Sequence, residues 1–391
     1  MALETPAPAA ASPASAATGA APPNRRRETA EARIFVASQW QLMWWKFLKH
    51  RLAMISAVVI MLVYLAALFV EPIAPYLPDA FNPPRTYAPP QRLHFVHEGR
   101  LVRPYVYGLK QEIEPEALRR IFKIDPEQRI AMGFFVHGAA YKLWGVFESD
   151  IHLFGPLNPD ERVYLLGADR VGRDVLTRII YGTRISMSIG LVGVFLSFIF
   201  GLTLGGISGY FGGQVDNLIQ RLIEFVRSVP TIPLWMGLAA AIPVTWPSER
   251  IYFSITIILS FIGWTGLARV VRGRFLSLRE EDFVMAARLD GVSELRVIFR
   301  HMIPSFTSHI IASITLAIPG MILAETALSF LGLGLQPPVV SWGVLLQEAQ
   351  NIRAVATAPW LLIPALAVIV TVLALNFLGD CLRDAADPYG R

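Results

Sequence analysis

The sequence predicts an all-α membrane protein with six transmembrane helices. Of its 391 residues, 54% are hydrophobic and only 17% are charged, and the mean hydropathy is +0.47. Soluble domains hold about 45–50% apolar and about 25% charged residues. The apolar residues also gather in segments close to the roughly 20 residues that a helix needs to cross a bilayer. These observations make the lipid bilayer a partner of the chain. They argue against an ordinary soluble enzyme, a disordered chain or a protein that binds nucleic acid.

Six segments fit a membrane-spanning helix. They are residues 52–70, 185–207, 218–241, 251–271, 306–323 and 359–379. The segment 218–241 is the least regular, because Arg221, Glu224 and Arg227 lie in its first turns. Pro230 and Pro233 interrupt it as well. Such a helix is tolerated only where neighbouring groups satisfy its backbone.

Basic residues indicate how these spans are oriented, because arginine and lysine near span ends stay on the cytoplasmic side. Seven of them lie between residues 25 and 51, and another seven lie between 269 and 300. The short loops on the other side hold only Arg250 and Arg353. We therefore expect both termini in the cytoplasm and residues 71–184 outside, as a long external insert between the first two helices.

The segments before and after the first span have distinct compositions. Residues 1–32 are rich in alanine and proline and are expected to form a disordered cytoplasmic tail. Residues 33–51 carry Trp40, Trp44 and Trp45 beside lysines, which predicts an amphipathic helix lying at the inner face; a simple extension of the first span is the alternative. The insert begins with a proline-rich extended arm and continues with aromatic residues. A small folded lid and a loosely ordered loop both fit that composition.

Small residues recur every four positions along the second span, at Gly193, Ser197, Gly201 and Gly205. This spacing lets another helix approach closely. The partner helix belongs either to the same subunit or to a sister subunit.

Sequence motifs for catalysis and metal binding are missing. None of the five lysines follows a glycine, so a G-K-[ST] phosphate-binding loop cannot form. The single cysteine, Cys381, excludes a multi-cysteine metal site. Charged residues at membrane depth are candidates for a translocation path. Glu224 can instead pair with Arg221 or Arg227. Glu325 either satisfies backbone donors of residues 331–338 or lines the path.

Residues 277–304, between the fourth and fifth spans, form a cytoplasmic loop with helix start and stop signals. Ser277 and Glu280 have the spacing of a capping box. Asp290 and Gly291 are expected to end that helix, because glycine accepts a left-handed turn. Ser293 is expected to cap a second short helix, and Pro304 marks the return to the membrane. Ala286 and Ala287 would leave a small flat area on the first helix. Such a loop can dock in a groove of another protein, or it can be a solvated connector.

This loop resembles the EAA loop of permease subunits of binding-protein-dependent ABC importers, with Ala286, Ala287, Gly291 and Pro304 in register. In that family the loop is the coupling helix that contacts the ATPase subunit, so these residues and Ser293 are candidates for ATPase coupling. The first position of the triplet is Met285 rather than glutamate. Glu281 or Asp282, one turn earlier, are the candidates to replace it.

Four further segments resemble the dipeptide, oligopeptide and nickel branch of the same family. They are residues 165–174, 209–213, 323–334 and 376–388. The resemblance implies the type I (MetI-like) permease fold, with its core in residues 185–391. It also implies a homologous second permease, two ATPases that bind ATP and Mg²⁺, and a periplasmic solute-binding protein. No cofactor is expected in this chain. A peptide is the expected substrate; nickel, a glycoside or an opine-like compound are alternatives, and a self-sufficient secondary carrier is an alternative of another class.

Overall fold

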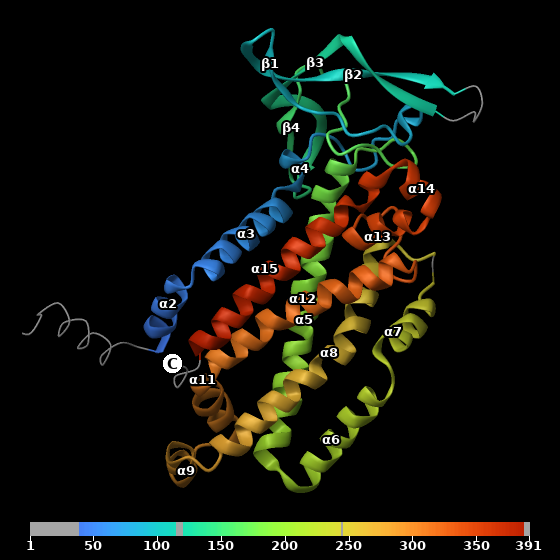
Figure 1. The fold of residues 1–391 in the computed structure, drawn as a ribbon. Coiled ribbons are helices and arrows are strands. Elements are labelled where there is room, and N and C mark those ends of the chain that lie inside the picture. Colours follow the sequence, from blue (N-terminus) through green and yellow to red (C-terminus); the bar gives the residue numbers. More distant parts are fainter. Residues whose placement is uncertain (1–38, 115–119, 244, 387–391) are drawn as a thin grey trace, which may run out of the picture.

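The protein is described here by a computed structural model covering residues 39–114, 120–243 and 245–386, in which long helices run side by side and a β-sheet covers one end of them (Figure 1). The tail predicted for residues 1–32 and residues 33–38 of the predicted interfacial helix lie outside the described residues. Helix α9 (Asp282–Leu289), the first short helix of the 277–304 loop, lies at the end of the bundle opposite to the sheet (Figure 1).

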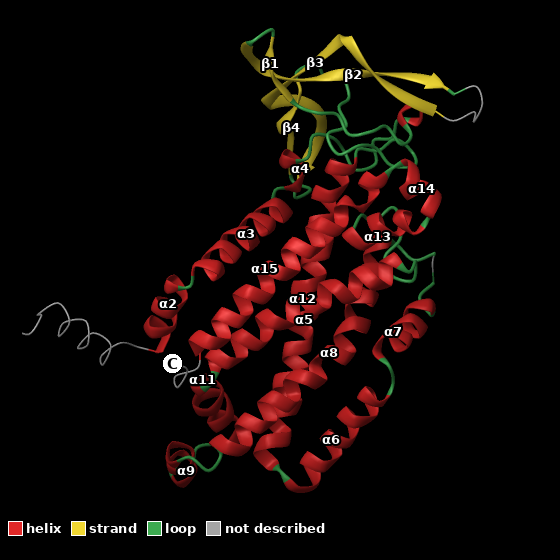
Figure 2. Cartoon of the chain, viewed as in Figure 1, coloured by secondary structure: helices red, strands yellow, loops and turns green. Residues whose placement is uncertain are grey.

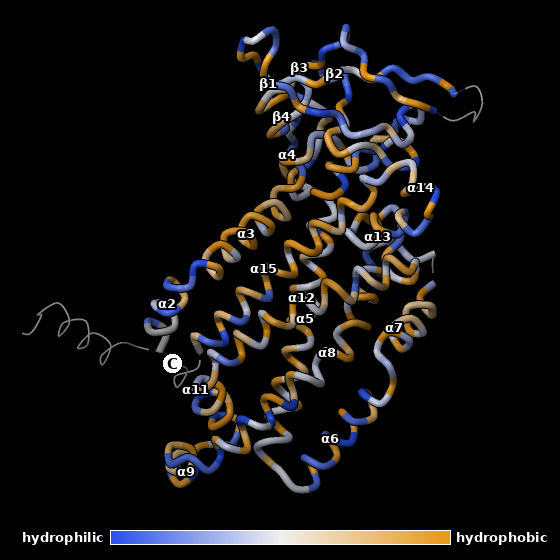
Figure 3. The backbone as a smooth tube through the Cα atoms, viewed as in Figure 1, coloured by the Kyte–Doolittle hydropathy of each residue, from blue (hydrophilic) through white to orange (hydrophobic). Residues whose placement is uncertain are grey.

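Five helices are long and apolar enough to cross a membrane within the described residues. They are α3 (Arg51–Leu68), α5 (Val175–Phe211), α8 (Ser248–Leu278), α12 (Thr307–Phe330) and α15 (Ile363–Ala386), the last extended at its start by the 3-10 turn Pro359–Leu362. Apolar residues cover most of their length, with polar residues concentrated near their ends (Figure 3). Five of the six predicted spans therefore correspond to single long helices. Four of them have shifted ends, and the fifth, α5, is much longer than the predicted 185–207.

The remaining predicted span, which is the third along the chain, is not one helix. Residues 218–241 are divided between α6 (Gly213–Ser228) and α7 (Thr231–Ala240), with the break at Val229 and Pro230. Proline cannot donate the backbone hydrogen bond that a continuous helix needs at this point. With 10 residues, α7 alone is too short to span a bilayer.

Helix α5 starts ten residues before the predicted second span because polar residues in its first turns find partners inside the protein. Asp174 caps it by accepting from the Thr177 amide at 2.8 Å. Arg178 and Arg184, which lower the hydropathy of this stretch, pair with Asp169 and Glu71. The insert therefore ends at residue 174, not at 184.

The prediction of an all-α protein is wrong for the insert, whose strands form a four-stranded antiparallel sheet in the order β1-β2-β3-β4 (Figure 2). The strands are β1 (His94–His97), β2 (Arg100–Ile113), β3 (Arg120–Leu143) and β4 (Phe147–Pro156). Pairs such as Val106 with Ile130 and Phe134 with Phe154 set the register. The insert is thus folded, as in the first of the two alternatives. Its proline-rich beginning is not one extended arm, since Pro72 lies in α4 (Val70–Ile73) and Pro83–Arg85 is a 3-10 turn.

The small-residue stripe of α5 packs against helices of the same chain. A Cβ at Gly205 would lie 2.5 Å from the Ala268 carbonyl oxygen of α8. A Cβ at Gly201 would meet Leu267, and one at Gly193 would meet Met321 of α12. The Ser197 hydroxyl donates to the Ser260 carbonyl at 3.1 Å. These contacts support the first of the two alternatives, in which the small-residue stripe packs against helices of the same subunit.

The remaining helices are short and lie at the two ends of the bundle. At one end are α2 (Gln39–Lys49), α9 (Asp282–Leu289), α10 (Glu294–Arg296), a π-helical turn (Val297–Met302) and α11 (Ile303–Ser305). At the sheet end are α13 (Trp342–Gln347), α14 (Ile352–Thr357) and the 3-10 turn Glu348–Gln350.

Candidate functional site

Helix α9 is a short helix held between two turns, and its C-terminal turn is set by Gly291. Gly291 has φ +74°, a left-handed conformation that suits glycine. Its amide donates to the Arg288 carbonyl at 3.0 Å, and the Val292 amide donates to the Ala287 carbonyl at 3.1 Å. These bonds form a glycine-type helix end. The predicted end of this helix at Asp290 and Gly291 is therefore observed.

The start of α9 differs from the prediction. Ser277 lies in the last turn of α8, and the capping box with Glu280 does not form, because α8 continues to Leu278. Glu281 occupies the N-cap position without a side-chain bond, and Asp282 lies in the first turn, where a carboxylate suits the helix dipole. Both acidic side chains are exposed. They are accessible to a partner, as is the half-exposed Met285.

The second helix begins where expected, but its cap is also different. Ser293 is the N-cap residue of α10 and makes no side-chain capping bond. After α10 the chain continues through the π-helical turn and α11, which contains Pro304, before α12 starts at Thr307. A chain of short helical turns thus connects α9 to α12, in place of a second independent capped helix.

One face of α9 is packed against the ends of the long helices. Val284 and Ala287 belong to a buried apolar cluster with Phe275 of α8 and Met302. The Arg288 guanidinium lies 4.7 Å from the centre of the Tyr210 ring of α5, a cation–π arrangement. Through these contacts α9 is attached to two long helices, α5 and α8.

The opposite face of α9 is exposed and apolar. Leu289 is 88% exposed, and Phe283, Met285 and the small Ala286 are exposed on the same helix. The following turns add two further exposed apolar side chains, Leu295 and Phe299. We call these six residues the α9 face. Large exposed apolar side chains, here beside the exposed charges of Asp282 and Arg288, are candidates for a contact with another protein.

A cluster of polar side chains next to α9 joins α5, α6 and α8. We call its four members, Ser208, Asp216, Gln220 and Arg272, the clasp. The Arg272 guanidinium donates to both carboxylate oxygens of Asp216, and the Ser208 hydroxyl also donates to that carboxylate. Gln220 completes the clasp through its side-chain amide, which donates to Ser208 at 3.0 Å.

The two charged residues proposed for a translocation path lie in different environments. Glu325 of α12 is fully buried and accepts hydrogen bonds from the hydroxyls of Ser329 and Ser341, at 2.8 and 2.7 Å. Ser329 in turn accepts from the Leu335 amide, so Glu325 reaches the 331–338 backbone through that hydroxyl. Glu224 of α6 is exposed and pairs with Arg221 at 2.9 Å. The pairing expected between Glu224 and Arg221 is therefore present, and Glu325 contacts the 331–338 segment through Ser329.

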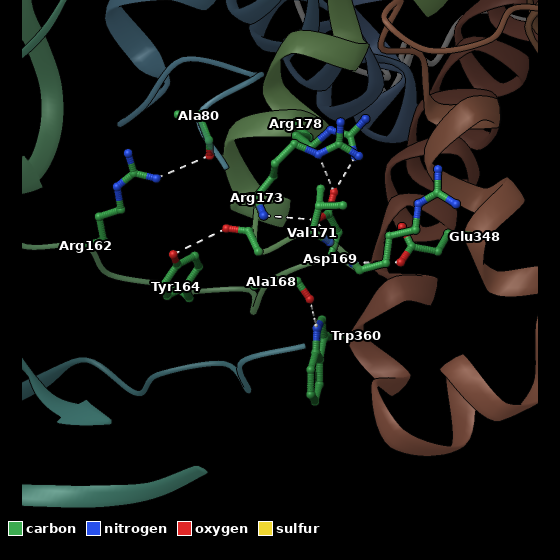
Figure 4. Close-up of polar contacts among 12 residues, drawn as sticks. Ala80, Arg162, Tyr164, Ala168, Asp169, Val171, Arg173, Arg178, Glu348 and Trp360 are labelled. Carbon is green, nitrogen blue, oxygen red and sulfur yellow. Dashed lines mark hydrogen bonds and ion pairs between the residues drawn. The ribbon is translucent and has the colours of Figure 1, made fainter. Parts of the chain in front are cut away.

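A second polar cluster lies at the sheet end, in the segment 165–174 that carries part of the family resemblance, but its contacts were not predicted from the sequence. Asp169 lies at its centre and accepts from the Arg173 Nε and the Arg178 Nη1 at 2.7 and 2.6 Å (Figure 4). The Arg170 amide donates to Glu348, which lies far along the chain, and the Trp360 indole donates to the Ala168 carbonyl. The loop before α5 is thereby fixed to the segment between α12 and α15.

Burial perturbs two carboxyl groups of this cluster. It raises the pKa of Asp174 to about 6. It also raises the pKa of Glu348, and the nearby Asp169 charge acts in the same direction. Beside them is a cavity of about 440 Å³ lined by arginine, glutamine and asparagine side chains, among them Arg170, Gln347 and Asn351. Within the described residues, no group of three or more His, Cys, Asp or Glu side chains is placed to hold a metal ion.

Two protein families match different parts of the chain. Residues 201–389 match the family described as "binding-protein-dependent transport system inner membrane component". Residues 38–90 match the N-terminal transmembrane domain of oligopeptide transport permease C. The first match contains α9 and the clasp, and the second contains α2 and α3.

Curated relatives cover most of the same region. The chain is 40% identical over 245 residues to the oligopeptide transport system permease protein OppC of Haemophilus influenzae, covering 62% of this chain and 76% of that protein. It is 37% identical to the dipeptide transport system permease protein DppC of Alkalihalophilus pseudofirmus, covering 61% and 81%. A solved structure of the MetNI methionine ABC transporter aligns with a TM-score of 0.41 and 17% identity, over 54% of this chain and 96% of that one.

Proposed function

We propose that this chain, which belongs to the family of inner membrane components of binding-protein-dependent transport systems, is the permease subunit of an ATP-driven importer of peptides. The observation that carries the proposal is the 40% identity to an oligopeptide permease over three quarters of that protein. The dipeptide permease is matched at a similar level. The substrate class proposed is therefore di- or oligopeptides.

In this proposal the α9 face is the contact with a separate ATPase subunit. Its support is the combination of an exposed apolar face with a buried face that is attached to α5 and α8. ATP would bring two ATPase subunits together, the α9 helices of this chain and of a homologous second permease would move with them, and the attached long helices would switch between two states. Rigid-body movement of packed elements is a common way to produce such a switch.

The orientation follows from the same assignment. The α9 end, with α2 near it, would lie in the cytoplasm, and the β-sheet would lie in the periplasm, where a solute-binding protein delivers substrate. The pair α6 and α7 would provide the sixth crossing as a broken helix of the MetI-like fold, satisfied by neighbouring helices and the second permease. The exposed Trp44 and Trp45 of α2 suit the inner headgroup level.

The chain itself would be non-catalytic, and ATP and Mg²⁺ would be bound by the ATPase subunits. The support is the lack of a lysine following a glycine anywhere in the sequence. Reconstitution tests both points. Proteoliposomes containing this chain, its second permease, the two ATPases and a loaded binding protein should accumulate a labelled peptide only with ATP. Uptake without the ATPases, or ATP hydrolysis by this chain purified alone, would contradict the proposal.

A further inference from the structure

The turn between β3 and β4 lies against the end of α3, next to the sheet (Figure 1). The Trp144 indole Nε1 donates to the carbonyl oxygen of Leu68, the last residue of α3, at 2.8 Å. The Trp144 ring also lies 5.6 Å from the Phe69 ring, centre to centre. The tip of this hairpin is therefore at the level at which α3 ends.

Other contacts identify that level as a membrane boundary. Helix α3 has 18 residues, which is about 27 Å of helix and close to the roughly 30 Å thickness of the hydrocarbon core. Arg184 donates to the carbonyls of Ala67 and Leu68 and pairs with Glu71 at 2.6 Å. An ion pair of this kind belongs at the headgroups, since charged side chains are costly deeper in the bilayer.

The hairpin tip exposes large apolar side chains at this level. Trp144 is 50% exposed, Val146 is 72% exposed and Phe147 is 61% exposed. Leu68, beside them on α3, is half-exposed as well. One residue pair further from the tip, Lys142 and Glu148 form an exposed ion pair at 2.9 Å. The tip is thus apolar where it meets α3 and becomes charged immediately above.

The backbone of the turn makes a tryptophan at its tip unexpected. Trp144 has φ +52° and Gly145 has φ +75°, the signs of a type I′ turn, within the three-residue loop that joins the paired Leu143 and Phe147. Asparagine or aspartate followed by glycine is preferred in this turn, and a bulky residue in the left-handed region is unusual. The turn's conformation therefore does not account for a tryptophan here, whereas tryptophan is enriched at the membrane–water interface.

We propose that Trp144, Val146 and Phe147 form a membrane anchor that inserts into the headgroup region of the lipid bilayer beside the end of α3. The anchor holds the β-sheet at a fixed height and tilt over the bundle. The occupant is lipid because the tip adjoins the exposed, apolar side of a spanning helix. The proposal depends on α3 crossing a membrane and not on the substrate or on the ATPase contact.

Fluorescence quenching in the full-length chain tests this proposal. Cys381 is replaced by alanine, a single cysteine is introduced at Val146, and a small thiol-reactive fluorophore is attached. The matched control carries its cysteine at Leu101, which is 87% exposed in the β1–β2 region. The chain is reconstituted in phosphatidylcholine–phosphatidylglycerol liposomes with a doxyl group near the lipid glycerol, or with iodide on both sides.

The probe at position 146 should be quenched several-fold more by the doxyl lipid, and several-fold less by iodide, than the probe at 101. Trp144→Asn is the second variant, because it restores the preferred Asn-Gly turn and keeps the hairpin folded while removing the indole. It should reduce doxyl quenching at 146. Quenching at 146 that equals the control would overturn the proposal. So would protection from both quenchers, which would mean that a protein covers the tip.

Discussion

The two ends of the helix bundle are stabilised in different ways. At the sheet end, Asp169 is buried and pairs with Arg173 and the buried Arg178, while Asp174 Oδ1 and Arg178 Nε are buried without a hydrogen-bond partner. At the α9 end, a short helix packs through Val284, Ala287 and Arg288 and leaves large apolar side chains exposed. The sheet end is held by buried ion pairs within the chain, whereas the α9 end leaves apolar surface that a partner would cover.

This difference predicts where substitutions act. Changes in the Asp169 cluster should destabilise the isolated chain. Changes at the α9 end should leave the isolated chain nearly unaffected and alter its work in the assembled transporter. The following predictions are ordered by the expected size of the effect.

Asp169→Ala should cause the largest loss of stability. Arg178 is only 4% exposed and would keep its charge without its carboxylate partner. Removing one partner of a buried pair costs about 3–5 kcal/mol. Denaturant titration of the purified chain in detergent would measure the loss. Glu148→Ala, which breaks an exposed pair with Lys142, is the control and should have little effect. Equal stabilities of the two variants would contradict the described difference between buried and exposed pairs.

Gly205→Ala should destabilise the middle of the bundle. The new Cβ would lie 2.5 Å from the Ala268 carbonyl oxygen, and this backbone atom cannot move aside without separating α5 from α8. Overpacking of this kind costs about 1–3 kcal/mol. The matched control is Gly266→Ala on α8, where a Cβ meets nothing within 4 Å. The same titration should therefore separate the two alanine variants, and no difference would mean that the stripe is not tightly packed within the chain.

Gly291→Val should leave membrane insertion near normal and reduce transport sharply. Valine opposes the left-handed conformation by about 1–2 kcal/mol, so the turn after α9 would change direction. Peptide uptake and co-purification of the ATPases would both be measured. Gly291→Asn is the matched control, because asparagine tolerates the left-handed region, and it should retain most uptake. Normal uptake by the valine variant would mean that the angle of α9 is not used.

The stability of the sheet end should fall between about pH 4 and pH 7. Burial raises the pKa of Asp174 from 3.8 to about 6, so the folded protein retains a proton that the unfolded chain has already lost. The stability that the protonated Asp174 contributes is therefore present at low pH and is lost as the pH rises through the pKa of the folded protein. Asp174→Asn, which can still accept from Thr177, should flatten this part of the profile. Thermal unfolding at a series of pH values would measure it, and an unchanged profile would be the contrary result.

Met285→Ala should have the smallest effect. Met285 is half-exposed on the α9 face, at the position where the EAA loop of the family carries glutamate. No ion pair can be lost there, and part of an apolar contact is all that the substitution removes. Uptake should remain far closer to normal than with Gly291→Val. If the two variants are equally damaging, the important contact has been assigned to the wrong residues.

The parts of the molecule that could be predicted from the sequence are those set by local composition. Apolar runs are sufficient to locate α3, α8, α12 and α15, because a bilayer requires them whatever their neighbours are. Gly291 was identified as a helix end because that signal lies within one turn. The broken segment at Pro230 was recognised as irregular for the same reason.

The features that were missed depend on contacts between distant residues. The early start of α5 was not predicted because Arg184 lowers the hydropathy of that stretch, and its partner Glu71 lies 113 residues away. The Asp169 cluster includes a contact between Arg170 and Glu348, 178 residues apart. The capping box at Ser277 satisfied its local pattern, yet the packed end of α8 extends past it. The β-sheet is not predicted by composition, because its strands are defined by their pairing, such as that of β2 with β3, rather than by an apolar run.

Photo-crosslinking at Leu289 tests the central claim most directly. A photoreactive amino acid is placed at Leu289, which is 88% exposed on the α9 face, or at Ile352, which is 84% exposed at the sheet end. In the assembled transporter, we predict that the probe at 289 crosslinks to an ATPase subunit and that the probe at 352 does not. An ATPase crosslink at 352, or none at 289 in an active complex, would contradict the assignment of the α9 face as the coupling contact.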